Sequence, residues 1–373
     1  MICSDLNTPT LLLDKKKLME NINRMQSRAD RLGVALRPHL KTLKSVDAAH
    51  ALVYSGAKGI TVSTLREADY FLEHGFSDIT YAIGMIPSRL PEVARLMSLG
   101  ADLKIMTDNL KVARAIASHA NSSGIPFRVL IEIDCGDQRG GIQSDDEELI
   151  PIVECIDTSY ASFEGVLTHA GHAYDVNSVS AIEAIAEQER YAAVHAATRI
   201  RCAGYEVSTI SVGSTPTGLY ANDLTGVTEL RAGVYTVFDM DQQSRGVCEV
   251  ENIALSVLSS VIGHNKTAGK ILLDAGGLAL SKDRGADVFR PEVGYGQICN
   301  VDGHAVTGLY VKGVSQEHGH VPVRNENDFK TFPIGSYLRI LPIHACMTAA
   351  AYNSFYVIEN DVIITEWKRI NGW

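Results

Sequence analysis

The chain has 373 residues, and its 46% hydrophobic and 21% charged residues are typical of a folded globular protein of one or two domains. Its net charge of -10 disfavours a nucleic-acid partner, and no apolar run is long enough to cross a membrane. Seven cysteines without any CxxC pair favour a reducing compartment, so we expect a cytoplasmic protein with neither nucleic-acid nor membrane partners.

Between residues 33 and 238 short β-rich runs alternate with longer stretches of helical periodicity. Eight parallel strands, each covered by a helix, close into a (β/α)8 TIM barrel, which we predict over residues 1–244. Helices are expected at Thr64–His74, Pro91–Leu99, Leu110–Ser122 and Ser180–Ala203. Strands are expected at Ala35–Leu40, Gly59–Ser63, Asp78–Ile83, Asp102–Thr107, Phe127–Asp134, Ser162–His169, Thr209–Gly213 and Glu229–Val237.

After residue 244 the pattern changes to strands separated by glycine-rich turns, with little helical periodicity. We therefore predict a second, all-β domain over residues 245–373. An early strand at Thr10–Asp14 precedes the first helix, and it could join this domain. The other strands are expected at Glu251–Gly263, Lys270–Asp274, His304–Gly313, Ser336–Pro342 and Phe355–Thr365.

Lys41 lies where the first predicted barrel strand ends and a helix is expected to begin. The loops after the strands form the catalytic face of such a barrel. A lysine amine held there can lose its proton and form a Schiff base with an aldehyde such as pyridoxal phosphate (PLP). A solvated surface lysine is the commoner outcome, so the interpretation depends on the residues around it.

The loops after strands seven and eight are the usual phosphate site of this barrel. Here they carry Val212–Thr217, a Gly-Ser-Thr loop, and Arg231–Tyr235. Glycine lets a phosphate approach the backbone, and amide and hydroxyl groups can donate to its oxygens. Taken alone, such a loop is more often a simple turn.

Two further loops at the predicted barrel mouth carry polar side chains. Asp134–Gly141 contains Arg139, which could bind a cofactor oxygen or form a surface ion pair. Thr168–Tyr174 offers two imidazoles and a phenol, including His169 and Tyr174. These groups can stack on a ring or relay a proton, so His169 and Tyr174 are candidate catalytic residues.

In the predicted β domain, His344 and Cys346 are two residues apart. On a strand they would face the same side, and imidazole with thiolate suits zinc. Two protein ligands would leave coordination positions for water or substrate. The alternative is a packed histidine beside a buried cysteine, which is the more frequent role of a free cysteine.

Together these segments resemble the family of D-serine dehydratases and D-threonine aldolases, which includes D-threo-3-hydroxyaspartate dehydratase and shares the alanine-racemase-type fold of PLP enzymes. The resemblance covers most of the chain. It is carried by RPHLKT at Arg37–Thr42, DCGDQRGG at Asp134–Gly141, THAGHAY at Thr168–Tyr174, VGSTPT at Val212–Thr217, ELRAGVY at Glu229–Tyr235, LDAGGLALSKD at Leu273–Asp283, QEHG at Gln316–Gly319 and HAC at His344–Cys346.

The resemblance implies a role for each candidate residue. Lys41 looks like the Schiff-base lysine, and Arg139 and Tyr174 look like residues that hold the pyridoxal ring. His344 and Cys346 match a pair that binds a divalent metal, zinc first, with manganese or magnesium as alternatives. The resemblance also implies a homodimer. The residues that look like phosphate ligands are Gly213, Ser214, Thr215, Gly233 and Tyr235.

We therefore expect a PLP- and metal-dependent lyase that acts on a D-β-hydroxy-α-amino acid. A dehydratase of the D-serine or D-threo-3-hydroxyaspartate type is favoured, because a His-x-Cys pair is similar to the dehydratase branch, whereas aldolases more often show His-x-Asp. Retro-aldol cleavage to glycine and an aldehyde is the second hypothesis, and amino-acid racemisation is the third. A PLP carrier without turnover and a metal-only barrel hydrolase remain as alternatives from other classes.

Overall fold

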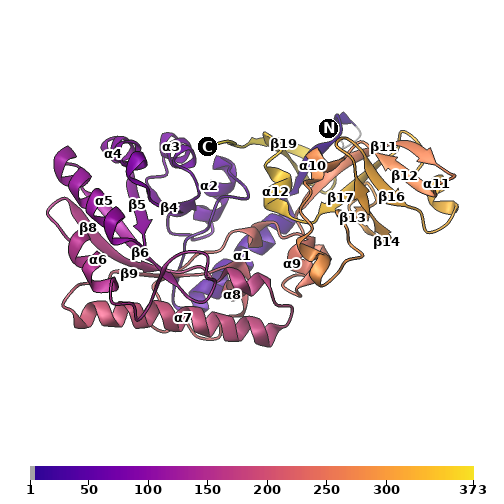
Figure 1. Ribbon diagram of the computed structural model, residues 1–373. Coiled ribbons are helices and arrows are strands. Elements are labelled where there is room, and N and C mark those ends of the chain that lie inside the picture. Colours follow the sequence, from indigo (N-terminus) through magenta and orange to yellow (C-terminus); the bar gives the residue numbers. More distant parts are fainter. Residues whose placement is uncertain (1–4) are drawn as a thin grey trace. The chain divides into compact units, whose positions relative to one another are not determined.

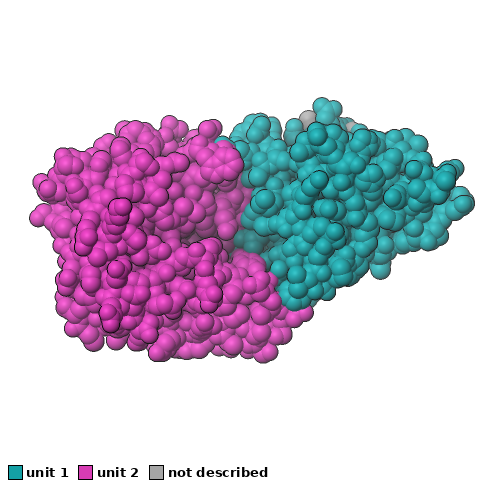
Figure 2. Space-filling model, viewed as in Figure 1, with its two compact units in different colours: residues 1–23, 234–371 teal, residues 24–233, 372–373 magenta. Residues whose placement is uncertain are grey.

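The computed structural model describes residues 5–373, which form two compact units (Figures 1 and 2). The barrel unit contains residues 24–233 with 372–373, and the β-rich unit contains residues up to 23 and 234–371. Residues 234–244 thus group with the β-rich unit, whereas the sequence pattern placed them in the barrel domain. No helix of the described residues is both long enough and apolar enough to span a membrane.

The barrel unit is built on a nine-stranded sheet in which eight parallel strands curl into a closed barrel. The two end strands meet through a parallel bridge between His39 and Thr61, which closes the ring. All eight predicted strands are present. They are β2 (Ala35–Leu36), β3 (Ile60–Val62), β4 (Asp78–Gly84), β5 (Asp102–Thr107), β6 (Phe127–Asp134), β8 (Ala161–Leu167), β9 (Thr209–Val212) and β10 (Glu229–Leu230), with the two-residue β7 (Ile142–Gln143) beside β6.

Helices follow the strands and surround the barrel (Figure 1). The side chain of Thr64 accepts the backbone N–H of Glu67 at the start of α3, and Gly124 ends α5 in the left-handed conformation. The four helices predicted from the sequence are confirmed, as α3, α4, α5 and α7. The helices are α1 (Lys15–Leu32), α2 (Val46–Tyr54), α3 (Leu65–Glu73), α4 (Leu90–Ser98), α5 (Leu110–Ser123), α6 (Leu149–Ile156), α7 (Val179–Cys202) and α8 (Thr215–Tyr220).

The first and the eighth predicted barrel strands are shorter than expected, and β2 ends at Leu36 instead of Leu40. The eighth was predicted to reach Val237, but β10 ends at Leu230 and a 3₁₀ helix, η4, covers Val234–Thr236. The six-residue α8 lies where no plain helical pattern was visible, because it contains Pro216 and Gly218. Its first turn is held instead by a capping box between Ser214 and Thr217.

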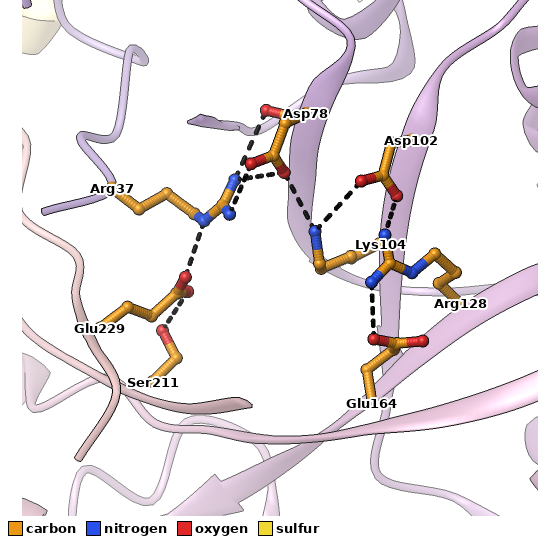
Figure 3. A network of polar contacts seen from close by, with 8 residues as sticks. All are labelled: Arg37, Asp78, Asp102, Lys104, Arg128, Glu164, Ser211 and Glu229. Carbon is orange, nitrogen blue, oxygen red and sulfur yellow. Dashed lines mark hydrogen bonds and ion pairs between the residues drawn. The ribbon is translucent and has the colours of Figure 1, made fainter. Parts of the chain in front are cut away.

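Charged side chains form a network near the N-terminal ends of the barrel strands (Figure 3). Arg37 donates to Glu229 and Asp78 at 2.8 Å each, and Lys104 donates to Asp78 at 3.0 Å. Arg128 continues the network through Asp102 and Glu164. This end lies opposite the catalytic face of such a barrel, so the network contributes to stability.

The β-rich unit is mostly β, and it contains a ten-stranded sheet within the described residues. Its strand β1 pairs with β11 antiparallel and β18 parallel, so the early strand does join this unit. The strands are β1 (Thr10–Asp14), β11 (Leu255–Asn265), β12 (Lys270–Leu273), β13 (Gly296–Cys299), β14 (Ala305–Tyr310), β15 (Gly313–Val314), β16 (Gly319–Pro322), β17 (Tyr337–Pro342), β18 (Ser354–Glu359) and β19 (Val362–Lys368).

One sequence-based expectation for this unit was wrong. The single strand predicted over Phe355–Thr365 is a hairpin of β18 and β19, because Asn360 and Asp361 adopt positive φ and reverse the chain. Four short helices also join its strands. They are α9 (Met240–Ser244), α10 (Gly277–Leu280), α11 (Asn327–Thr331) and α12 (Ala345–Ala349).

Candidate active site

Lys41 lies in the loop after β2, at the C-terminal end of the barrel strands, and its side chain is exposed. The loop is held on both sides. Leu40 donates its N–H to the carbonyl oxygen of Thr61 at 2.9 Å, and Lys44 pairs with the buried Glu67 at 3.1 Å. The backbone thus fixes where the Lys41 side chain begins, while the amine remains accessible.

His39 lies beside Lys41 and is held as a neutral imidazole. Its Nδ1 accepts the N–H of Lys41 at 3.3 Å, so Nε2 carries the proton and faces the Ser63 hydroxyl at 3.4 Å. Burial lowers the pKa of His39 well below its usual value, and the nearby positive charges of Lys41 and Arg231 lower it further.

His169 directly follows Thr168 at the end of β8 and contacts the loop after β9. Its Nδ1 lies 3.0 Å from the carbonyl oxygen of Gly213. A carbonyl oxygen only accepts, so Nδ1 carries the proton and Nε2 carries a lone pair. Burial, followed by the charge of Lys41, lowers the pKa of His169 to about 3, which keeps the ring neutral.

The Gly-Ser-Thr loop after β9 packs closely against its neighbours. Gly213 has a φ of +135°, and a Cβ added there would lie 2.1 Å from the carbonyl oxygen of Arg231. Thr215 donates its N–H to the Tyr174 hydroxyl oxygen at 3.4 Å, from the 3₁₀ helix η3 (Gly171–Tyr174). Gly213, Ser214, Thr215, His169 and Tyr174 are therefore brought together.

The two remaining predicted phosphate residues come from the segment after β10. Gly233 packs against His39, because an added Cβ would lie 2.9 Å from the carbonyl oxygen of His39. Tyr235 is fully buried in η4 of the β-rich unit, and burial raises the pKa of its phenol. Its contact with a phosphate stays a prediction.

Arg139 has a 59% exposed side chain and forms two long ion pairs, to Glu132 and Asp137 at 3.8 Å each. The surface ion pair considered from the sequence is therefore present. Its loop is shaped by Asp134, whose carboxylate accepts the backbone N–H groups of Gly136 and Gln138. A role of Arg139 in holding a cofactor stays a prediction.

In the β-rich unit, His344 and Cys346 form a side-chain hydrogen bond. The sequence-based placement of the pair on a strand was wrong. β17 ends at Pro342, His344 is the N-cap residue of α12, and Cys346 lies in the first turn of that helix. The two side chains meet because the helical turn begins between them.

Two aspartates, Asp239 and Asp283, hold this pair in place. Asp239 accepts the N–H of Ala345 at 2.8 Å, and Asp283 contacts Nδ1 of His344 at 2.5 Å. Burial alone would lower the pKa of His344, but the hydrogen bonds to Asp283 and Cys346 outweigh it and raise the pKa to about 11. Within residues 5–373, no three His, Cys, Asp or Glu side chains are grouped to hold a metal.

Comparisons with known proteins identify the family. A model of the alanine racemase N-terminal domain matches residues 13–241, and a model of the serine dehydratase domain matches residues 254–358. D-threo-3-hydroxyaspartate dehydratase of Delftia sp. strain HT23 is 44% identical over 99% of this chain and 98% of its own. The chain belongs to this dehydratase family.

Two more members of the dehydratase family are similar over the full length. D-serine dehydratase of Dictyostelium discoideum is 32% identical over 99% of this chain and 98% of its own. A solved D-threo-3-hydroxyaspartate dehydratase, a cysteine-to-alanine variant in the metal-free form, has a TM-score of 0.98 at 42% identity and covers 100% of both chains. As a member of the dehydratase family, the protein is a PLP-dependent lyase with an alanine-racemase-type barrel.

One residue at this dehydratase-family site received no role from the sequence. Arg231 is part of the ELRAGVY segment, and its side chain is buried among the loops. It donates to the Ser211 hydroxyl at 2.5 Å and to the carbonyl oxygen of Thr168. Burial lowers its pKa, and the carboxylate charges of Glu229 and Glu189 oppose that effect. Its place inside the barrel depends on tertiary contacts that the motif alone does not reveal.

Proposed function

We propose that the protein is a metal-dependent dehydratase of a D-β-hydroxy-α-amino acid, either D-threo-3-hydroxyaspartate or D-serine. The observation that carries this proposal is the placement of His344 and Cys346 together at the start of α12 in a chain that belongs to the dehydratase family. The 44% identity with D-threo-3-hydroxyaspartate dehydratase favours that substrate over D-serine, whose dehydratase is 32% identical.

The residues at the barrel mouth fit PLP. The Tyr174 hydroxyl and the Thr215 N–H lie 3.4 Å apart, so one phosphate oxygen could accept from both. Gly213, Ser214, Thr215 and Gly233 of the barrel unit would bind the phosphate. Bound PLP supplies an electron sink for the α-carbon of the substrate.

Lys41 would hold the cofactor covalently and then act as the base that takes the α-proton. Its side chain is exposed and lies next to His39. Because the pKa of His39 is lowered, that imidazole is neutral and adds no positive charge beside Lys41. His169 would present the lone pair of Nε2 toward the ring or the substrate, because Nδ1 is already engaged with Gly213. Tyr174 and Arg139 would hold the pyridoxal ring.

The pair of His344 and Cys346 fits a divalent metal. Imidazole and sulfur are zinc ligands, and Asp283 at Nδ1 is the carboxylate partner that metal-bound histidines usually have. In D-threo-3-hydroxyaspartate dehydratase, the histidine and the cysteine replaced in two solved variants are also two positions apart. A bound metal supplies a Lewis acid for the β-hydroxyl group. Zinc is the first candidate.

The assembly proposed for this enzyme is a homodimer, as the family resemblance implies. Light scattering coupled to size-exclusion chromatography would then give twice the chain mass of 40.5 kDa. A monomer at micromolar concentration would contradict the proposal.

Product identity tests the proposed reaction. The enzyme is incubated with D-threo-3-hydroxyaspartate, D-serine and D-threonine, each with and without a metal chelator. We expect a keto acid and ammonia in equal amounts from the preferred substrate, and loss of both with chelator. Glycine and an aldehyde would assign the aldolase reaction instead, and turnover that resists exhaustive metal removal would contradict the role of the metal.

A further inference from the structure

A buried carboxylate with no role in the sequence interpretation lies beneath the proposed phosphate loop. Glu189 of α7 is only 2% exposed and accepts four hydrogen bonds. Burying a carboxylate is costly unless its oxygens are satisfied, so four partners on one residue indicate a specific structural task.

The four donors come from two segments, the loop after β8 and the loop after β9 together with the first turn of α8. After β8, the hydroxyl of Thr168 and the N–H of Ala170 donate to Glu189, both at 3.0 Å. After β9, the N–H of Gly213 and the hydroxyl of Thr217 donate to it, both at 2.8 Å. Glu189 therefore connects the segment that carries His169 to the Gly-Ser-Thr loop.

The helix is built to bring this side chain close to the loops. Glu189 lies on the buried face of α7, which is otherwise lined by small and aliphatic residues. Alanines on this face keep the helix near the strands, so a glutamate from outside the barrel can reach the ends of β8 and β9. The buried residues of α7 are Ile182, Ala186, Glu189, Ala192, Ala193, Ala196, Ala197 and Ile200.

The contacts of Glu189 also determine how the loop hydroxyls are oriented. Because the Thr217 hydroxyl donates to Glu189, its lone pairs face Ser214, whose N–H donates to it at 3.0 Å. Gly213 is held on both sides, since its N–H donates to Glu189 and its carbonyl oxygen accepts from His169. Removing the carboxylate would release all of these groups together.

We propose that Glu189 is the positioning residue that holds the Gly-Ser-Thr loop and His169 in the arrangement that binds PLP. This inference rests on the proposed cofactor site. Glu189 touches neither cofactor nor substrate and acts through Thr217, Gly213 and Thr168. Substitution of Glu189 should therefore cost more free energy of PLP binding than free energy of unfolding.

The test compares two substitutions of Glu189 with a matched control in the full-length enzyme. Glu189→Gln keeps the oxygen that accepts three of the bonds but cannot accept the Thr217 proton, whereas Glu189→Ala removes all four. The control is Glu164→Gln, which removes a carboxylate of the charge network that pairs with Arg128 at 2.7 Å. PLP dissociation constants are measured from the visible absorbance, and urea midpoints are measured without PLP.

We expect PLP affinity to fall about tenfold in Glu189→Gln, because losing one buried charge-assisted bond costs about 1.4 kcal/mol or more. Glu189→Ala should lose more PLP affinity. If Glu189→Ala does not fold, the PLP affinity of Glu189→Gln decides the test. Affinity in Glu164→Gln should stay within twofold of the wild type.

Wild-type affinity in both Glu189 variants would overturn the inference, as would an equal loss in Glu164→Gln. If the wild-type protein itself showed no PLP absorbance, the proposed function would fail first. That outcome is distinct from a wild type that binds PLP together with variants that bind it equally well.

Discussion

Two histidines at the barrel mouth, His39 and His169, are neutral for the same physical reason. Each is half-buried near Lys41, and each has one ring nitrogen engaged with a group that determines its tautomer. In an unfolded chain a histidine has a pKa of about 6.5. Folding therefore lowers the proton affinity of both rings.

This difference predicts an acid dependence of stability. With a folded pKa of about 3 for His169, the unfolded chain binds more protons as the pH falls below about 6.5. The stabilising contribution is complete above that pH and is lost progressively toward pH 3. We expect the urea midpoint of His169→Gln to fall less than that of the wild type between pH 7 and pH 5. Parallel pH curves for the two proteins would contradict this.

Asp283 should determine metal affinity through His344. Asn at position 283 can still contact the ring, but it brings no charge and weakens the ligand. We expect Asp283→Asn to lower zinc affinity by about tenfold to a hundredfold, as substitution of such carboxylate partners usually does. Competition with a colorimetric chelator measures this affinity directly.

Asp287→Asn is the matched control for Asp283→Asn. Asp287 lies four positions further along the same segment and pairs with Arg284 at 2.7 Å. Its substitution should leave zinc affinity unchanged. Equal affinities in the two variants would show that Asp283 does not act through His344.

At the level of elements, the Gly-Ser-Thr loop depends on a glycine that no other residue can replace. Gly213→Ala would place a Cβ 2.1 Å from the backbone oxygen of Arg231, so the loop or the segment after β10 must move. We expect at least a tenfold loss of PLP affinity together with a lower urea midpoint.

Gly124→Ala separates backbone strain from this steric clash. Gly124 also has a positive φ, of 66°, but nothing lies within 4 Å of an added Cβ. This variant should lose about 1 kcal/mol of stability and no PLP affinity. If both glycine variants kept or lost PLP affinity equally, the close approach of Arg231 to the loop would not matter for cofactor binding.

The sequence predicted the barrel-mouth loops better than it predicted the local structure of His344 and Cys346. Lys41 and the Gly-Ser-Thr loop were located correctly because strand ends in a β/α-barrel converge on one face. The helix that carries His344 and Cys346 could not be predicted, since its start is capped by Asp239, far away in the chain. Glu189 was missed for a similar reason, because its four partners become neighbours only in the folded barrel.

Across the whole barrel, spacing alone was enough to find all eight strands, because helical segments separate most of them. Strand lengths were less predictable. β10 has only two residues, since the segment after it turns into η4 instead of continuing the ladder. In the β-rich unit, alternating patterns did not distinguish one long strand from the hairpin of β18 and β19.

The charge network of the barrel should matter for stability but not for the cofactor. Arg37 is 6% exposed and Glu229 10%, so Arg37→Met would leave a buried carboxylate without its cation. We expect a loss of about 3–5 kcal/mol in the free energy of unfolding with unchanged PLP affinity. Arg95→Met, at an exposed pair with Glu92, should cost about 0–1 kcal/mol. Equal costs would contradict the burial argument.

The most direct test of the central claim is to identify the lysine that holds PLP. The holoenzyme is reduced with borohydride, digested, and mapped by tandem mass spectrometry. We predict that the reduced pyridoxyl group is found on Lys41 and not on Lys44, whose amine pairs with Glu67. Lys41→Ala should abolish the label and Lys44→Met should retain it. A label on Lys44 or on any other lysine would contradict the assignment of Lys41 as the lysine that holds PLP.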